Sequence, residues 1–212
     1  MYAHHSLEEH LKKIRKEVEP YGKRLVMTEG HFALPGRNRC EVLSTWGAGA
    51  AYARCLNVIE RNSDILDIAT MADFFGNRWQ VNAVLLPTPI GSGEAYLQPV
   101  GEVMKLFSHH IGTHSVELEA IEGVDATASR SEDTLYLHLV NTSMTEARDI
   151  PLELDGEPVE KATAFEIVSD PMTEITPLNT QVFKPVEKAV SGIYQLPPAA
   201  VCALEIPLTK IV

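Results

Sequence analysis

The sequence is poor in cysteine and basic residues, and it lacks any long apolar run. Its 212 residues include three cysteines, Cys40, Cys55 and Cys202. An odd number without close spacing makes a poor disulfide framework or zinc site, so we expect buried free thiols. Asp and Glu outnumber Lys and Arg by 29 to 18, and such an acidic chain repels phosphates, so we expect no nucleic-acid partner. No apolar run approaches the roughly 20 residues that span a bilayer, so we expect no membrane contact.

Several sequence signals are also missing. The first ten residues contain no basic segment followed by an apolar stretch, so they do not form a secretory signal. No glycine-rich phosphate loop is present, and the histidines lack metal-ligand spacing, so we expect no cofactor and no metal. Free cysteines slightly favour the cytoplasm over secretion. The compartment stays open, because we expect the true N-terminus to lie upstream of Met1.

What remains is the composition of a globular protein, 45% apolar and 22% charged. The charge is uneven along the chain. Residues 1–112 carry 12 basic and 12 acidic side chains, whereas residues 113–212 carry 6 basic and 17 acidic ones. We therefore expect two domains, 1–112 and 113–212.

The first domain alternates helical and strand patterns. Amphipathic or small-residue periodicity predicts helices over 6–19, 40–61 and 99–110, and a short apolar strand is expected over 23–28. Residues 65–72 fit either a helix or a buried strand. This βα alternation predicts a parallel sheet, and two strands cannot complete one. We therefore expect the end of a larger α/β domain whose beginning is absent.

The second domain shows short runs of period two, separated by turn signals. This pattern predicts an antiparallel β-sandwich with Leu135, Leu137, Leu139, Phe165 and Ile167 inward and the intervening polar residues facing solvent. The alternating runs are 116–121, 134–140, 150–154, 162–168 and 201–206.

Glu29 directly follows the first apolar strand. The carboxyl ends of parallel strands carry the chemistry of α/β domains, so Glu29 is a candidate catalytic residue. An exposed loop carboxylate is the commoner interpretation. His31 lies two residues on and could face the same cleft, although taken alone it is more often a loop histidine.

Asp73 and Trp79 are candidate sugar contacts. Asp73 closes the second possible strand, and the aromatic residues Phe74, Phe75, Trp79 and Tyr96 follow it. Aromatic rings stack on sugar faces at carbohydrate sites. They also fill protein cores, and that interpretation is the commoner one.

The ordered series of segments resembles the last part of the α-L-arabinofuranosidases of glycoside hydrolase family 51. The resemblance spans nearly the whole chain, and no single motif in it is as specific as a phosphate-binding loop. It is carried by Leu25–Gly30, Cys55–Asp64, Ile68–Asp73 with Trp79, Pro87–Pro89, Val103–Ser108, Leu135–Asn141 and Gln195–Val201.

The resemblance implies a (β/α)₈ TIM barrel followed by an antiparallel, jelly-roll-like β-sandwich. It makes 23–29 the seventh barrel strand and 66–73 the eighth, and it places Glu29 at the catalytic nucleophile. Retaining glycosidases need a second carboxyl about 5–5.5 Å away. The family takes that acid/base from strand four, so the resemblance implies a fragment without it and without most of the barrel. The implied partner is an arabinose-containing oligo- or polysaccharide, and a homo-oligomer is left open.

Two departures put the substrate preference in doubt. Gly30 stands where family members usually have Trp, and Asp73 stands where bacterial relatives often place a sugar-binding Gln. Two other functions also stay open. The chain could be a non-catalytic carbohydrate-binding or structural β-sandwich module, or one half of a split glycosidase.

Overall fold

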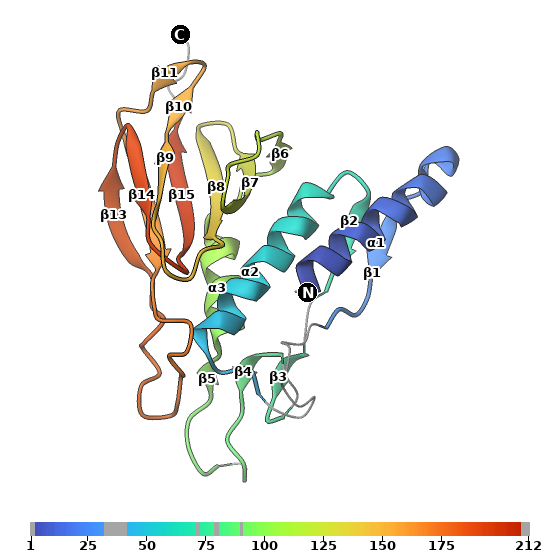
Figure 1. The fold of residues 1–212 in the computed structure, drawn as a ribbon. Helices are drawn as coiled ribbons and strands as arrows, with labels where there is room; N and C mark the ends of the chain where they lie inside the picture. Colours follow the sequence, from blue (N-terminus) through green and yellow to red (C-terminus); the bar gives the residue numbers. More distant parts are fainter. Residues whose placement is uncertain (1–2, 32–41, 71–72, 79–80, 90, 209–212) are drawn as a thin grey trace.

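The computed structural model describes residues 3–31, 42–70, 73–78, 81–89 and 91–208, with residues 3–5 described by their backbone alone. Over these ranges the chain is mostly β-sheet with three α-helices, α1 (Ala3–Val18), α2 (Trp46–Arg61) and α3 (Pro99–His109). Figure 1 shows α2 and α3 lying between the large sheet and the N-terminal elements. None of these helices is long and apolar enough to cross a membrane.

Helix α1 ends just before Pro20, which has no backbone N–H to donate to a helical hydrogen bond. Pro20 lies in a single 3₁₀ turn, η1 (Glu19–Tyr21), and Gly22 closes that turn with a left-handed φ of 57°. The apolar stripe of α1 is buried through Leu11, which packs with Val58 of α2. Helix α1 confirms the helix predicted over 6–19, and α3 confirms the one predicted over 99–110.

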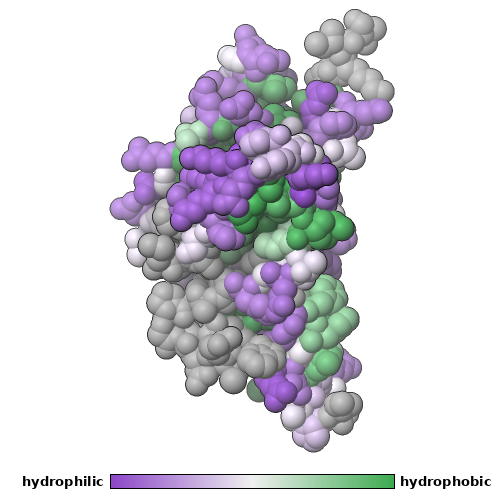
Figure 2. Space-filling view, turned by 90° about the vertical axis from the view of Figure 1, so that its right-hand side faces the viewer, coloured by the Kyte–Doolittle hydropathy of each residue, from purple (hydrophilic) through white to green (hydrophobic). Residues whose placement is uncertain are grey.

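Strands β1 (Leu25–Met27) and β2 (Leu66–Ala69) form a parallel pair, which confirms the predicted parallel pairing. One face of the pair packs against α1 and α2. The other face carries Val26 and Ile68, which are register partners and are 55% and 57% exposed. Viewed from the side that carries α1 and β1, the molecule shows hydrophobic residues in the middle of a largely hydrophilic surface (Figure 2).

A second small sheet contains β3 (Asp73–Gly76), β4 (Asn82–Leu85) and β5 (Tyr96–Leu97), with β3 parallel to β4 and β5 antiparallel to it. The strand predicted over 66–73 is too long at its carboxyl end. Strand β2 stops at Ala69, because β1 offers no backbone partner beyond the bond from Thr70 N to Met27 O at 2.9 Å. Asp73 instead begins β3.

Helix α3 lies very close to β4. A Cβ atom at Gly101 would be 2.1 Å from the carbonyl oxygen of Ala83, so only glycine allows this approach. The turn after α3 is equally tight, because a Cβ at Gly112 would be 2.2 Å from the backbone of Arg130.

The second half of the chain forms a six-stranded antiparallel sheet in the order β13-β12-β15-β8-β7-β6. Two-stranded sheets β9–β14 and β10–β11 accompany it. The strands of the large sheet are β6 (His114–Val116), β7 (Val124–Arg130), β8 (Thr134–Asn141), β12 (Ala162–Ile167), β13 (Val186–Val190) and β15 (Val201–Pro207). The others are β9 (Arg148–Pro151), β14 (Ile193–Leu196), β10 (Glu153–Leu154) and β11 (Glu157–Pro158).

The central strands of the six-stranded sheet are buried on both faces. On one face, Leu139 and Leu204 pack with Leu196 of β14. On the other face, Val140 and Ile167 share a core with α2 and α3. The indole of Trp46, at the start of α2, is fully buried and donates a hydrogen bond to the carbonyl oxygen of Ala199 at 2.7 Å. One continuous core therefore joins the helices to the sheet.

Of the residues expected inward, Leu137 and Leu139 are buried and Leu135 is half-buried against β9 and β14. Phe165 and Ile167 lie on the other face of the sheet, against the helices, so placing all five on one inward face is wrong. The expectation that the intervening polar residues face solvent is wrong. His138 is buried against the helices and Glu166 against β14, because each face of the sheet is covered.

Two predicted boundaries are also wrong. The helix expected from residue 40 begins at Trp46, because Thr45 is extended and forms a bridge to Glu174. The strand expected over 116–121 ends at Val116. Cys40 lies outside the described residues, whereas Cys55 and Cys202 are free and buried as expected.

Candidate functional site

Glu29 lies two residues beyond the end of β1, at the carboxyl end of the parallel pair. Its side chain is 79% exposed. The short β1 ladder fixes the backbone as far as Met27, whose carbonyl oxygen accepts bonds from both the backbone nitrogen and the hydroxyl of Thr70. The carboxylate thus projects from the sheet edge at which parallel α/β domains place their reactive groups.

His31 is the side chain that the structure brings to Glu29. Its Nε2 lies 2.8 Å from Oε1 of Glu29, and the ring is about half exposed. A protonated Nε2 donates to the carboxylate and restrains its rotamer. Within the described part of the chain the remaining ring nitrogen, Nδ1, has no hydrogen-bond partner, so it can bind a ligand hydroxyl or water. This pairing follows the two-residue spacing in the sequence.

Asp73 is half-buried at the first position of β3, in register with Asn82 of β4. Within the described part of the chain, no hydrogen bond or ion pair joins Asp73 to Glu29 or His31. Trp79, the other predicted sugar contact, lies outside the described residues. The structure therefore brings together two of the four predicted site residues.

The opposite end of the parallel pair is held by two arginines. Arg24 pairs with the carboxylate of Asp67 and donates to the carbonyl oxygens of Asp64 and Ser63 at 2.6 and 2.8 Å. Arg15 of α1 pairs with Asp64, and the guanidinium lowers the pKa of that carboxyl below its ordinary value. These contacts lie at the amino ends of the strands and serve stability. No local signal in the sequence pairs these residues.

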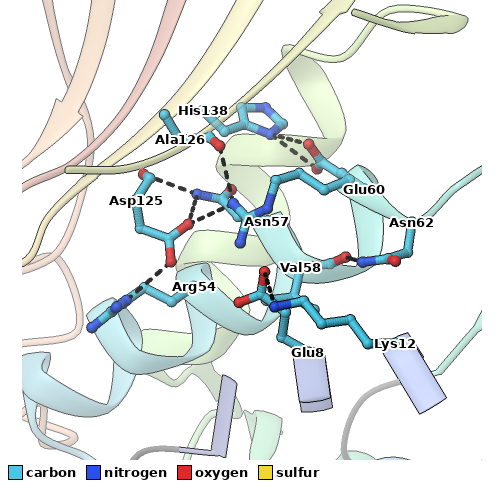
Figure 3. Close-up of polar contacts among 11 residues, drawn as sticks. Glu8, Lys12, Arg54, Asn57, Val58, Glu60, Asn62, Asp125, Ala126 and His138 are labelled. Carbon is cyan, nitrogen blue, oxygen red and sulfur yellow. Dashed lines mark hydrogen bonds and ion pairs between the residues drawn. The ribbon is translucent and has the colours of Figure 1, made fainter. Parts of the chain in front are cut away.

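A polar cluster that sequence reasoning missed joins α2 to the large sheet (Figure 3). The Asp125 carboxylate accepts from Arg54 Nε at 3.2 Å and Arg61 Nη1 at 2.8 Å, and the Asn57 amide donates to its Oδ1 at 3.1 Å. The Asp125 side chain is only 8% exposed. Two cations thus compensate one buried anion, which makes this cluster a structural tie rather than a reactive site.

His138 of β8 completes this tie. Its Nδ1 lies 2.9 Å from each carboxylate oxygen of Glu60, and its Nε2 lies 2.9 Å from the carbonyl oxygen of His110. The ring is stacked on Phe107 at 3.7 Å. The two ring nitrogens therefore face the Glu60 carboxylate and a backbone carbonyl oxygen, and the ring joins β8 to α2 and to the end of α3. At 1% exposure it has no access to substrate.

The two described cysteines are unsuited to covalent chemistry. Burial raises the pKa of each thiol, Cys55 and Cys202, to about 12. The thiolate is the nucleophilic form, so both thiols are inert near neutral pH. Among the described residues, no group of three or more His, Cys, Asp or Glu side chains is placed to hold a metal ion.

Comparison with known families and structures places this geometry in context. The model of the family described as "Alpha-L-arabinofuranosidase C-terminal domain" matches residues 32–199. That range includes Asp73 and Trp79, and it begins just after Glu29 and His31. No curated protein sequence matches the chain.

Solved structures share the fold. A family 51 α-L-arabinofuranosidase from Thermotoga petrophila RKU-1 superposes with a TM-score of 0.77 at 20% identity, over 96% of this chain and 48% of that one. The enzyme from Thermotoga maritima, solved as an arabinose complex, gives 0.76 at 19% identity, over 95% and 48%. The enzyme from Xanthomonas axonopodis pv. citri gives 0.73 at 17% identity, over 94% and 45%. At these identities the likeness shows the fold alone, and the chain spans about half the length of these structures.

Proposed function

Because this chain belongs to the α-L-arabinofuranosidase C-terminal domain family, we propose that it is the C-terminal part of a retaining α-L-arabinofuranosidase. Its substrates are arabinose-containing oligo- or polysaccharides. In this proposal residues 1–112 are the last part of a (β/α)₈ barrel and residues 113–212 are a β-sandwich. A preceding segment supplies the rest of the barrel.

The uncovered side of the parallel pair supports the missing barrel. Parallel sheets need both faces covered, yet Val26 and Ile68 are exposed on one face of β1 and β2. Phe74 and Phe75 on β3 are also more than half exposed. A polypeptide about as long as this chain accounts for the other half of the solved structures it resembles. The strands of that segment would bury the uncovered face.

Glu29 is the proposed nucleophile, and its place at the carboxyl end of β1 is the observation that carries the proposal. A retaining mechanism uses one carboxylate to attack the anomeric carbon and a second carboxyl to protonate the leaving oxygen. Glu29 is exposed and held by His31, which suits it for attack. The proposal places the second carboxyl on the preceding segment. His31, Asp73 and Trp79 are the proposed sugar contacts.

The test uses the longer protein that the proposal implies. Glu29→Gln keeps the shape of the side chain but cannot attack, so steady-state hydrolysis of an aryl α-L-arabinofuranoside should fall by about two orders of magnitude or more. Glu132→Gln, an exposed change on the turn between β7 and β8, is the matched control. Retention of more than a few per cent of the rate by Glu29→Gln would exclude the assignment.

A second measurement separates a nucleophile from a merely structural carboxylate. Glu29→Ala opens space beside the anomeric carbon, and added azide should then attack that carbon while the aryl group leaves. The product is an arabinosyl azide of inverted configuration, which NMR identifies. A structural carboxylate gives no azide product.

A non-catalytic carbohydrate-binding or structural module is the second candidate. The observation favouring it is that the family match begins at residue 32, beyond Glu29, and continues through most of the large sheet. Hydrogen exchange with arabino-oligosaccharide distinguishes the two, because a binding module would be protected over residues 113–212 alone. A split glycosidase is distinguished by the genomic sequence directly upstream of Met1.

A further inference from the structure

A cavity lies at the junction between the small sheet and the second half of the chain. It has a volume of about 770 Å³, within the range of sites that bind small molecules. One wall is formed by residues 85–88 and 92–97 with Asn77, and the other by the segment 177–184; Val42 also lines the cavity. Neither Glu29 nor His31 lines it.

The wall from the second half is rigid. The Asn179 side chain accepts from the backbone nitrogen of Thr176 at 2.5 Å and donates to the carbonyl oxygen of Glu174 at 3.0 Å. Phe183 is fully buried, with its ring 5.2 Å from that of Trp46. The segment therefore presents Thr180 and Gln181 from a loop that is fixed at both ends.

The wall from the second half is also tied to α3, the helix that directly follows the first wall. Lys184 Nζ lies 2.5 Å from Oε1 of Glu102, a carboxylate of α3 that is only 1% exposed. The other oxygen, Oε2, has no hydrogen-bond partner in the described part of the chain. The ammonium has three donors and this is its one described partner, so Lys184 brings free donors to the cavity that it lines.

The lining suits an uncharged, hydroxyl-rich ligand. It combines an amide at Gln181, hydroxyls at Thr88 and Ser92, and the half-buried ring of Tyr96. The two charged residues, Glu94 and Lys184, have opposite signs. The chain as a whole is acidic, so neither the lining nor its surroundings favour an anion.

We propose that this cavity is a second carbohydrate subsite, which holds arabinose units of the substrate other than the unit being cleaved. The inference rests on the proposed function for the identity of the sugar. Tyr96 supplies a ring face, Gln181 and Lys184 supply hydrogen bonds to hydroxyls, and the two walls position the chain. Both halves of the protein contribute to it.

The test is a calorimetric titration of the 212-residue chain with α-1,5-linked arabinotriose. Gln181→Ala should weaken binding about three- to tenfold through the loss of hydrogen bonds, and Tyr96→Ala at least about tenfold. The matched control for the first is Gln195→Ala, an exposed glutamine on β14, and for the second Tyr21→Ala, an exposed tyrosine in η1. Both controls should bind within about twofold of the wild-type chain.

Hydrogen exchange with arabinotriose should protect 85–97 and 177–184. A titration without saturable binding would overturn the subsite, as would equal weakening by Gln181→Ala and Gln195→Ala. The two proposals fail separately. The titration needs no turnover, and the Glu29 experiments on an aryl arabinofuranoside need no second subsite.

Discussion

The six-stranded antiparallel sheet and the parallel pair β1–β2 differ in how they are covered. The large sheet has α2 and α3 on one face and β9–β14 on the other, and Leu139 and Val140 are buried on opposite sides of the same strand. The parallel pair is covered on one face only, and Val26 and Ile68 are exposed on the other. The large sheet is packed on both faces by other elements of this chain, whereas the parallel pair is packed on one face only.

Under the proposed function, this difference separates stability from chemistry. The covered sheet is the region in which substitutions should cost folding free energy. The uncovered pair carries Glu29 and His31 at its carboxyl end, and its exposed face costs little to change within this chain. The following predictions, ordered from the largest effect to the smallest, test that contrast.

Leu139→Ala should lower the free energy of unfolding by about 2–5 kcal/mol, because it leaves a cavity between β8 and β14. Val26→Ala removes apolar atoms from a side chain that is more than half exposed, and it should change the free energy by less than about 0.5 kcal/mol. Urea unfolding of both variants measures the contrast. Equal costs would show that β1–β2 is as well covered as the large sheet.

His138→Ala should cost about 2–3 kcal/mol, because the Glu60 carboxylate loses its ring partner and Phe107 loses the ring stacked on it. The exposed His114 on β6 provides the control, and His114→Ala should be nearly neutral. Thermal unfolding of the two variants under identical conditions measures the difference. A neutral His138→Ala would mean that the tie between α2 and β8 contributes nothing.

The Arg15–Asp64 pair should contribute at most about 1 kcal/mol, because it lies near the surface. The guanidinium lowers the pKa of Asp64 below its ordinary value of 3.8. A depressed carboxyl pKa stabilises the folded state above the unfolded value, and that contribution is lost as the pH falls through the folded pKa. NMR titration should therefore find the Asp64 pKa below 3.8 in the chain and restored by Arg15→Ala. An unchanged pKa in that variant would contradict the assignment.

Val26→Ser with Ile68→Ser should leave the free energy of unfolding nearly unchanged and reduce self-association of the isolated chain. Size-exclusion chromatography over a concentration series measures that association. The pair Val186→Ser and Ile193→Ser, which removes exposed apolar residues from β13 and β14, is the control. Equal improvement by both pairs would show that the face of β1–β2 is not special.

Local patterns predicted the helices and the strongly alternating strands, because their periodicity records which face is buried. The sequence Val124–Arg130 alternates polar residues with one valine and two alanines, which is a weak apolar signal, and β8 and β6 pair with this strand on both sides. Strand β4 has four residues, which is too short to show a recognisable hydrophobic periodicity.

The same limit applies to the site. The contact between Glu29 and His31 was predictable because they stand two positions apart in a segment that follows a strand. The pairing of His138 with Glu60 was not, because 78 residues separate them and only the packed fold brings the imidazole to the carboxylate. The second wall of the junction cavity, at 177–184, likewise gave no local signal.

The contact between Gly101 and Ala83 has a consequence for natural variation. Any side chain at position 101 would push α3 away from β4, and one at 112 would displace the turn that leads into β6. When sequences that diverge from this one are gathered, both positions should hold glycine even where the neighbouring residues have been replaced. Glycine at both positions would then identify chains in which α3 packs closely against β4 and the turn before β6, whether or not they keep a glutamate at position 29.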